Sequence, residues 1–311
     1  MRAFTVLQTD GIAQLRLSDV ARPIPARGEV TIQIKAAGVT PTELLWYPTT
    51  HKKDGQERIA AVPGHEFSGV VVELGEDAGP FAIGDAVFGM NDWFASGATA
   101  EFCVAPVTSI ALKPAQLSHV DAAAVPISAL TAWQALTKHA EAEKGERLLL
   151  AGAGGSVGLM AVQIATMLGC NVIASASKSD FTLLNKLGVS ELIDYQTTRF
   201  EEVLTSVDIV LDTVGSDILQ RAAHLLRANG RMVTIAADAE GKDDPLISKA
   251  FFIVEPSGRQ LEKISGLISR GVVRPFVKAV VPFEAAPQAY LERGLAAAKP
   301  GKIVIQVEPP V

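Results

Sequence analysis

The residues with the clearest chemical meaning form a glycine-rich turn after the apolar run Leu148–Leu150. Gly152, Gly155 and Gly158 stand three residues apart, and the segment 159–168 that follows has strong helix formers and no proline. Glycine permits unusual φ values and a close approach of the backbone to a pyrophosphate. A helix N-terminus adds free N–H groups and a favourable dipole. The pattern therefore predicts a dinucleotide-binding turn rather than a merely structural one.

The end of the next predicted strand, 171–175, bears on which dinucleotide is bound. A free ribose 2′-hydroxyl usually meets Asp or Glu about 20 residues past the glycines. Here Ser177 and Lys178 stand at that place, and the first carboxylate is Asp180. A lysine charge and a serine hydroxyl suit a 2′-phosphate, and Tyr195, after the following strand, is placed to close over it. The pattern favours NADPH over NADH; the alternative is that Lys178 is a solvated loop lysine.

A metal site is the first interpretation that His65-Glu66 suggests. Catalytic zinc has three protein ligands, usually with cysteine or histidine among them. Neither Cys103 nor Cys170 lies in a suitable loop, and no His/Cys pair has the spacing of ligands. We therefore expect no metal, and we interpret His65 as a hydrogen-bonded turn histidine. Because both cysteines lie in apolar surroundings, we expect them to be buried thiols, as is usual for proteins of the reducing cytoplasm.

The predicted secondary structure that must position these residues changes near Ser118. Residues 1 to about 120 are mostly β, with short strands between glycine and proline turns. From Arg147 to about Val254, short apolar strands alternate with helices, which is typical of a doubly wound parallel sheet. The predicted strands are 148–151, 171–175, 191–193, 207–211 and 231–235, and the predicted helices are 156–168, 181–186, 217–226 and 260–270.

Strand-like runs return near the end of the chain, at 277–281 and 302–307, on either side of a short predicted helix at 284–294. These runs are expected to fold back onto the first part of the chain. We therefore predict an α/β protein of two domains. Residues 1–121 and 271–311 form a discontinuous, mostly β substrate domain, and residues 122–270 form a Rossmann domain that binds NADPH.

Composition narrows the classes of partner. The chain has 311 residues, of which 48% are hydrophobic and 20% charged, with a net charge of −6. No basic stripe is visible, so nucleic acid is not expected as a partner. No apolar run approaches the roughly 20 residues of a membrane span, and Met1–Val6 alternates like a strand instead of resembling a signal peptide.

Together these motifs resemble the medium-chain dehydrogenase/reductase superfamily, most closely its zinc-independent quinone oxidoreductase branch. The resemblance covers nearly the whole chain and runs through Ala36–Val39, Pro63–Gly69, Gly84–Gly89, Ala129–Ala132, the glycine turn, Asp212–Gly215 and Gly301–Val304. It implies a GroES-like substrate domain beside the Rossmann domain, and a homodimer. In zinc-dependent relatives a cysteine ligand stands where this chain has Thr40 and another ligand where it has Ile127, so the resemblance implies a metal-free enzyme.

Members of this branch bind NADPH and pass hydride to quinones or to the β-carbon of activated alkenes. The resemblance assigns the pyrophosphate to backbone N–H groups of Ser156 and Val157, and the 2′-phosphate to Ser177, Lys178 and Tyr195. It places Thr131 against the nicotinamide carboxamide, and it lines the nicotinamide channel with Val214, Ala236, Phe252 and Val254. Candidate donors to the acceptor oxygen are Thr40, Tyr47 and His65, among which the sequence does not choose. Many relatives carry asparagine at Thr40 and aspartate at Glu43, and some carry tyrosine at Leu45.

We therefore expect a cytoplasmic, NADPH-dependent reductase of small quinones or enones. Two alternatives stay open at this point. A metal-dependent alcohol dehydrogenase is disfavoured by the missing ligands. An NADPH-binding protein with a sensing or structural role also fits, because an intact nucleotide site does not prove turnover.

Overall fold

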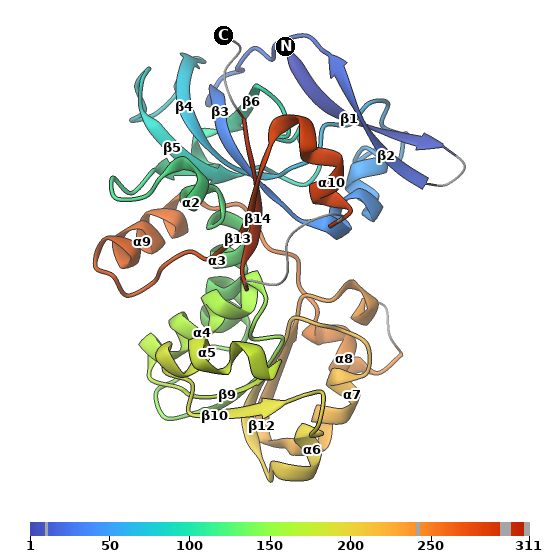
Figure 1. The fold of residues 1–311 in the computed structure, drawn as a ribbon, viewed down its shortest axis with the longest axis vertical. Helices are drawn as coiled ribbons and strands as arrows, with labels where there is room; N and C mark the ends of the chain where they lie inside the picture. Colours follow the sequence, from blue (N-terminus) through green and yellow to red (C-terminus); the bar gives the residue numbers. More distant parts are fainter. Residues whose placement is uncertain (10–11, 241–242, 293–299, 308–311) are drawn as a thin grey trace. The chain divides into compact units, whose positions relative to one another are not determined.

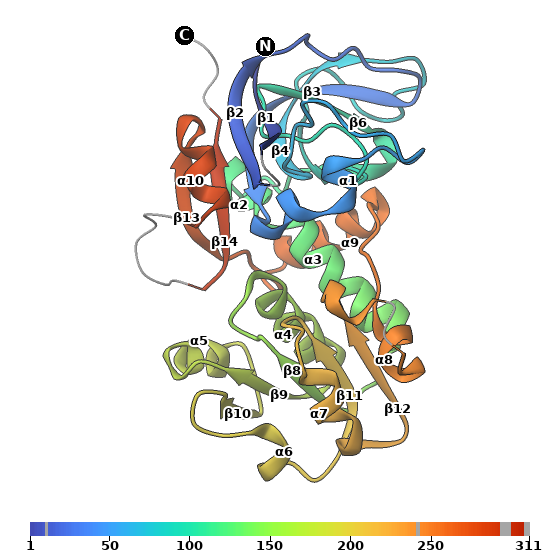
Figure 2. The same ribbon diagram turned by 90° about the vertical axis from the view of Figure 1, so that its right-hand side faces the viewer.

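The computed structural model describes residues 1–9, 12–240, 243–292 and 300–307 (Figures 1 and 2). The chain divides into unit 1, made of Met1–Ile127, Glu255–Gly271 and Pro275–Val311, and unit 2, made of Ser128–Val254 and Val272–Arg274. Helix α9 (Gly258–Ser269) therefore lies in unit 1, although the strand–helix alternation groups it with the parallel sheet. A Cβ on Gly258 would lie 2.4 Å from the Ile110 carbonyl oxygen, so the helix start packs directly on the backbone of unit 1.

Unit 2 is built on a five-stranded sheet in the order β10-β9-β8-β11-β12. Every pairing in it is parallel, so the expected doubly wound sheet is present. Its strands are β8 (Arg147–Ala151), β9 (Asn171–Ala176), β10 (Glu191–Asp194), β11 (Val207–Asp212) and β12 (Leu226–Thr234). Because all five strands run the same way, their carboxyl ends share one edge, where such sheets bind ligands.

Helices cover both faces of this sheet (Figures 1 and 2). Leu149 of β8 packs in a cluster with residues of α6 (Phe200–Val203), α7 (Ile218–Ala222) and α8 (Pro245–Ala250). Its neighbours Leu148 and Leu150 are equally buried and point to the opposite face, because side chains alternate along a strand. That face carries α4 (Ser156–Leu168) and α5 (Phe181–Lys186), both with the bounds that the sequence predicts.

Unit 1 holds the β1–β2 hairpin and a seven-stranded sheet in the order β13-β14-β3-β4-β5-β7, with β6 also paired to β3. The hairpin strands are β1 (Arg2–Thr9) and β2 (Ile12–Asp19). The sheet strands are β3 (Glu29–Val39), β4 (Glu66–Leu74), β5 (Ala86–Met90), β6 (Phe102–Pro106), β7 (Ile110–Leu112), β13 (Val277–Pro282) and β14 (Lys302–Gln306). This arrangement is the GroES-like fold that the sequence predicts.

The C-terminal strands return to the first part of the chain as expected, because β14 pairs antiparallel with β3. Ile303 and Ile305 of β14 join the buried cluster around Ile32 and Phe67. The helix predicted at 284–294 is shorter in the structure, where α10 runs over Ala286–Tyr290. The predicted residues 293 and 294 lie outside the described part of the chain.

The shorter helices of unit 1 follow local sequence signals. Helix α2 (His119–Ala123) is capped by Ser118, whose hydroxyl accepts a hydrogen bond from the Asp121 N–H at 3.0 Å. Two further short helices occupy the loop-rich segment after β3. They are the 3-10 helix η1 (Pro41–Leu45) and α1 (Tyr47–Thr50).

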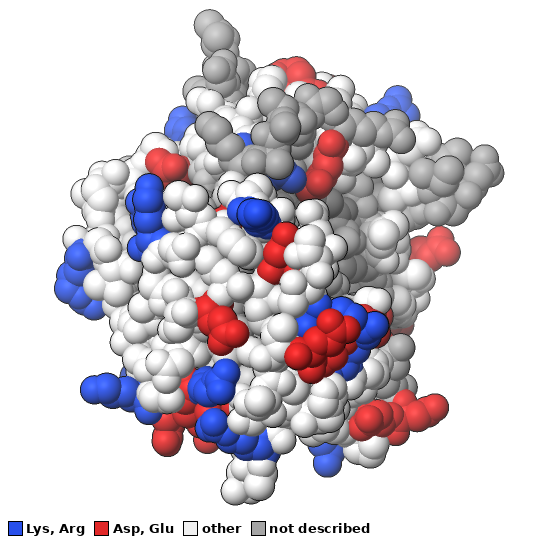
Figure 3. All heavy atoms as spheres, turned by 60° about the horizontal axis from the view of Figure 1, so that its bottom comes forward, with Lys and Arg blue, Asp and Glu red and all other residues white. Residues whose placement is uncertain are grey.

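Surface and thiol features also match the composition. Cys103 and Cys170 are buried and free, as predicted. Positive and negative side chains are interspersed on the face that Figure 3 draws. Among the described residues, none of the helices has the length and apolar character to cross a bilayer.

Two helix glycines provide a matched test of packing. A Cβ on Gly158 in α4 would lie 2.2 Å from the Gly152 carbonyl oxygen, whereas a Cβ on Gly266 in α9 would meet nothing nearer than an Arg270 nitrogen at 3.4 Å. We expect Gly158→Ala to lower the free energy of unfolding by about 1–3 kcal/mol through overpacking. Gly266→Ala should raise it by about 0.5–1 kcal/mol through helix propensity. Urea unfolding followed by circular dichroism measures both, and shifts of the same sign would contradict the packing argument.

Candidate functional site

The turn between β8 and α4 uses its glycines in three ways. Gly152 has φ +81°, and a Cβ there would lie 2.4 Å from Thr213 Oγ1. Gly158 allows the first helical turn of α4 to pack directly against the backbone of the glycine-rich loop at Gly152. Gly155 is different, because the nearest atom to a Cβ built on it is the Gly152 carbonyl oxygen at 3.4 Å. The backbone is therefore open at Gly155, where a ligand would approach.

The N-terminus of α4 has the features of an anion-binding site. Gly155 is its N-cap, with extended φ and ψ of −74° and 169°, and no side chain caps the helix. The first N–H groups of a helix have no partner within it, and the 13-residue length of α4 supplies a full dipole. The N–H groups of Ser156 and Val157 therefore fit a pyrophosphate, and the residues present fit a dinucleotide.

The end of β9 collects the residues predicted to select the cofactor. Ser179 Oγ donates to Ser177 Oγ at 3.1 Å, which leaves the Ser177 hydroxyl proton for another acceptor. Lys178 is exposed and forms no ion pair with any residue that the structure describes. Tyr195 is 61% exposed, and its backbone N–H donates to the Ala176 carbonyl at 3.4 Å. The structure thus brings these predicted residues to one end of the sheet.

One carboxylate also reaches the glycine turn. A Cβ on Gly154 would lie 2.2 Å from Asp180 Oδ2, so this acid rests directly on the turn. Sequence spacing placed Asp180 beyond the position that selects the cofactor. Its contact with Gly154 could be found only in three dimensions.

Asp212, at the end of β11, fixes the next turn. It is 1% exposed and accepts from the backbone N–H of Val214 at 2.9 Å, from that of Gly215 at 3.0 Å and from Thr234 Oγ1 at 2.9 Å. A Cβ on Gly152 would lie 2.8 Å from Val214 Cγ2, so the turns after β8 and β11 touch. Asp212 is therefore a structural carboxylate that presents Val214, which is 59% exposed, beside the glycine turn.

The other residues assigned to the nicotinamide differ in access. Ala236 is partly exposed just after β12. Phe252 and Val254 are 8% and 7% exposed, and the Phe252 ring stacks on His139 with centroids 4.2 Å apart. Thr131 is 3% exposed in α3 (Pro126–Gln134). Ala236 is thus accessible within unit 2, whereas Phe252, Val254 and Thr131 are largely enclosed.

Unit 1 contains a buried polar cluster around Glu66. Its carboxylate forms an ion pair with Lys302, and Oε2 accepts the Ile127 N–H at 2.9 Å. The Lys302 ammonium also donates to Thr40 Oγ1 at 3.1 Å. Glu66 is 0% and Lys302 5% exposed, whereas Thr40 is partly exposed. Burial raises the pKa of Glu66 above its ordinary value, and the Lys302 charge acts against that rise.

Strand register brings this cluster together. Gly38 of β3 lies opposite Glu66 of β4, and Val39 lies opposite Ile303 of β14. The next pair along β14 and the chain after β3 is therefore Lys302 and Thr40. A Cβ on Gly38 would lie 2.5 Å from Glu66 Cγ, so only glycine lets that side chain cross the strand.

His65, next to Glu66, belongs to a second pair. Its Nδ1 lies 2.5 Å from Glu43 Oε1, and its Nε2 lies 3.4 Å from the Ala95 carbonyl oxygen. Glu43 Oε1 also accepts the Gly64 N–H at 2.7 Å. His65 is 2% exposed, so both of its ring nitrogens are engaged inside unit 1. This is the arrangement of a hydrogen-bonded turn histidine.

Tyr47 is the most open of the three candidate donors. It is 54% exposed at the start of α1, and its ring stacks on His51 with centroids 4.4 Å apart. Thr40 accepts a hydrogen bond from the Lys302 ammonium, whereas His65 contacts the carboxylate of Glu43.

The donor set does not suit a metal ion. Among the residues that the structure describes, no group of three or more His, Cys, Asp or Glu side chains has a suitable arrangement. Glu66 forms an ion pair with Lys302, and His65 Nδ1 contacts the Glu43 carboxylate. Thr40 and Ile127 supply no thiolate or imidazole.

Sequence reasoning missed two residues of this site. Glu43 was noted only as a departure from relatives, and Lys302 only as part of Gly301–Val304. A signal for Lys302 was present, because a lysine opens an otherwise apolar strand. Its partners lie more than 200 residues away in the chain, so their identity required the structure.

Comparisons with known proteins bear on the family. A family model described as an alcohol dehydrogenase GroES-like domain matches residues 26–115, and one described as a zinc-binding dehydrogenase matches residues 187–305. The NAD(P)H oxidoreductase RTN4IP1, mitochondrial, of Mus musculus is 32% identical, over 90% of this chain and 82% of its own. The chain belongs to the medium-chain dehydrogenase/reductase superfamily.

Two further matches place it near the quinone oxidoreductases of this superfamily. The 2-methylene-furan-3-one reductase of Solanum lycopersicum is 30% identical, over 99% of this chain and 80% of its own. The solved quinone oxidoreductase of Coxiella burnetii superposes with a TM-score of 0.86, at 27% identity, over 99% of each chain. An oxidoreductase with a nicotinamide cofactor and a small-molecule substrate is the function that these medium-chain relatives support.

The Glu66–Lys302 pair makes a direct prediction for stability. Lys302→Met leaves the buried Glu66 without its cation, which should lower the free energy of unfolding at neutral pH by about 3–5 kcal/mol. Lys302→Met/Glu66→Gln removes both charges and should recover most of that loss. Because an unpaired buried Glu66 has a raised pKa, the loss in Lys302→Met should shrink as the pH falls toward about 5. Urea unfolding across pH measures this, and a pH-independent loss would contradict it.

Proposed function

We propose that this protein is an NADPH-dependent, zinc-independent reductase that transfers hydride to small quinones or activated alkenes. The observation that carries the proposal is the donor set of unit 1, in which Lys302 neutralises Glu66 beside Thr40. A site of this kind offers a hydrogen-bond donor to an acceptor oxygen, but no means of binding and ionising an alcohol. The relatives named as a quinone oxidoreductase and a furanone reductase support this chemistry.

The protein's part in the reaction is binding and electrostatics. A bound reduced nicotinamide supplies a hydride, which carries two electrons and one proton, to the electron-poor carbon of the acceptor. As that carbon–hydrogen bond forms, a π pair moves onto the conjugated oxygen and gives an enolate. For a quinone, this enolate tautomerises to the hydroquinone anion, and in each case the anion takes one proton from water. A donor held at that oxygen stabilises the developing charge. We assign the pyrophosphate to Ser156 and Val157, and we keep Thr131, Val214, Ala236, Phe252 and Val254 as proposed nicotinamide neighbours.

The choice of NADPH is supported by Ser177, Lys178 and Tyr195 at the end of β9. Asp180 favours a second candidate, NADH, because its carboxylate rests on the glycine turn and would accept a hydrogen bond from a free 2′-hydroxyl. We also propose that the protein is a homodimer with a cytoplasmic location. The mouse relative is named as mitochondrial.

Cofactor choice is tested with three single variants. Lys178→Ala should weaken NADPH binding by about 1–3 kcal/mol, because it removes a charge-assisted hydrogen bond, and leave NADH binding unchanged. Lys186→Ala, an exposed lysine in α5, is the matched control and should change neither. Asp180→Asn should weaken NADH binding only. Calorimetric titration with both cofactors measures these effects, and a wild type that prefers NADH would reverse the proposed choice.

The reaction class is tested with a panel of acceptors. NADPH absorbance should fall with small quinones and α,β-unsaturated carbonyls. It should not fall with saturated aldehydes and ketones, because their carbonyl oxygen needs a stronger electrophilic catalyst before the carbon accepts a hydride. Turnover of alcohols with NADP⁺ would favour an alcohol dehydrogenase. Tight NADPH binding without reduction of any acceptor would favour a sensing role.

A further inference from the structure

Lys302 is an unusual group to bury. Lys302 is 5% exposed and is the first residue of β14. Removal of an ammonium from water is unfavourable unless paired charges and hydrogen bonds offset it. Glu66 supplies the charge and Thr40 Oγ1 one acceptor. Glu66 is itself held at its other oxygen by the Ile127 N–H. The ammonium is thus fixed between a buried carboxylate and a partly exposed hydroxyl.

The direction of the hydrogen bonds matters. An ammonium donates and never accepts, so Thr40 Oγ1 must be the acceptor at 3.1 Å. The single proton of the Thr40 hydroxyl is therefore directed elsewhere. Among the residues that the structure describes, no acceptor for it is present. The hydroxyl is a donor whose oxygen is already polarised by a positive charge, which strengthens its bond to an anion.

The other candidate donors lack this combination. Both ring nitrogens of His65 are engaged, by Glu43 and by the Ala95 carbonyl. Tyr47 is exposed and stacked on His51, with no cation bonded to its hydroxyl among the described residues. We propose that Thr40 is the residue that binds the oxyanion of the reduced acceptor, and that Lys302, locked by Glu66, is the positioning residue that supplies the positive charge behind it.

This inference rests on the proposed reductase function and names the group that recognises the acceptor oxygen. The ligand chemistry is a conjugated oxygen that becomes anionic, as in a quinone or an enone. The ammonium–hydroxyl pair provides charge without a metal. Because Lys302 reaches the oxygen only through Thr40, removal of the Thr40 hydroxyl should abolish the contribution of both.

The test uses p-nitrophenol as an analogue of a hydroquinone monoanion, titrated by its absorbance into the full chain with NADP⁺ present. The wild type should bind the phenolate at least about tenfold more tightly than the phenol, which is a pKa lowered by about one unit. Thr40→Val and Lys302→Met/Glu66→Gln should bring that ratio close to one. Thr40→Ser keeps the hydroxyl and should keep the ratio. Thr31→Val, a buried threonine of the same β3 strand, is the control for a threonine-to-valine change.

Turnover is measured on the same variants. Thr40→Val should lower kcat for a quinone by about 100-fold with the Kd for NADPH unchanged, since loss of one oxyanion donor typically has an effect of this size. If quinones are reduced but the phenolate ratio of every variant equals that of the wild type, the inference is overturned and the proposed function stands. If the phenolate ratio responds as expected but no acceptor is reduced, the reductase function falls and the oxyanion site stands. A wild type with no preference for the phenolate overturns the inference in either case.

Discussion

The buried ion pair between Glu66 and Lys302 is the constraint around which unit 1 is arranged. A carboxylate that is fully inaccessible to water must have a cation or a proton. The cation comes from the first residue of β14, so the C-terminal strand has to pair beside β3 for the N-terminal half of the sheet to tolerate Glu66. The glycine at Gly38, which makes room for the Glu66 side chain, belongs to the same requirement. One electrostatic demand therefore ties together segments from the two ends of the chain.

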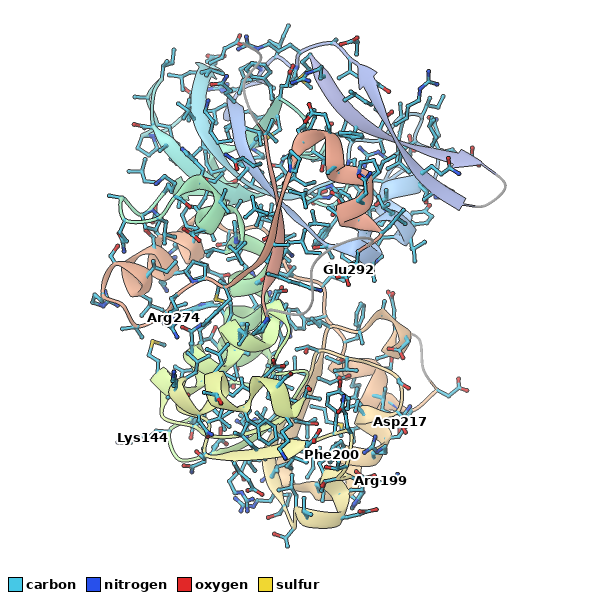
Figure 4. The ribbon with its side chains drawn as sticks, in the orientation of Figure 1. Lys144, Arg199, Phe200, Asp217, Arg274 and Glu292 are labelled. Atoms are coloured by element: carbon cyan, nitrogen blue, oxygen red, sulfur yellow. The ribbon has the colours of Figure 1, made fainter. Side chains whose placement is uncertain are left out.

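In unit 2 the constraint is different, because the phosphates of the proposed dinucleotide must be able to approach backbone N–H groups. Its parallel sheet brings the turns after β8, β9 and β11 to one edge, and Asp212 holds the third turn against the first. A chain of ion pairs joins Arg199, Glu201, Arg221 and Asp217 around α6 and α7, with Arg221 over the Phe200 ring at 4.7 Å. Figure 4 labels Arg199, Phe200 and Asp217 of this region. Its Arg221 partner lowers the pKa of Glu201 to about 2. Arg221 of α7 thus joins Glu201 of α6 to Asp217, the N-cap residue of α7, so this network ties the two helices together.

The sequence predicted the parts of this molecule that depend on local rules. In unit 2, α4 and α5 match their predicted bounds to the residue. The helix predicted at 217–226 is shorter, with α7 over Ile218–Ala222, and the strand predicted at 231–235 starts earlier, with β12 over Leu226–Thr234. Helix α8 was missed because it begins after the turn residues Asp243-Asp244-Pro245 and is only six residues long. The glycine turn was predictable because unusual φ values and close backbone approach are local requirements that glycine satisfies. The contact of Asp180 with Gly154 and that of Lys302 with Thr40 and Glu66 were not, because partners distant in sequence are set by strand register.

The proposal of a conjugated acceptor rather than an alcohol rests on the electrostatics of the Glu66 cluster in unit 1. Oxidation of an alcohol requires removal of its hydroxyl proton. In unit 1, Glu66 is paired with Lys302, and the ring nitrogens of His65 contact Glu43 and the Ala95 carbonyl oxygen. Reduction of a conjugated acceptor begins from a neutral molecule and creates negative charge on oxygen. We propose that the Glu66–Lys302 pair, which has no net charge and whose ammonium donates to the Thr40 hydroxyl, favours the second process. In this proposal, the ion pair that makes Glu66 compatible with a buried position also stabilises the negative charge that forms on the acceptor oxygen.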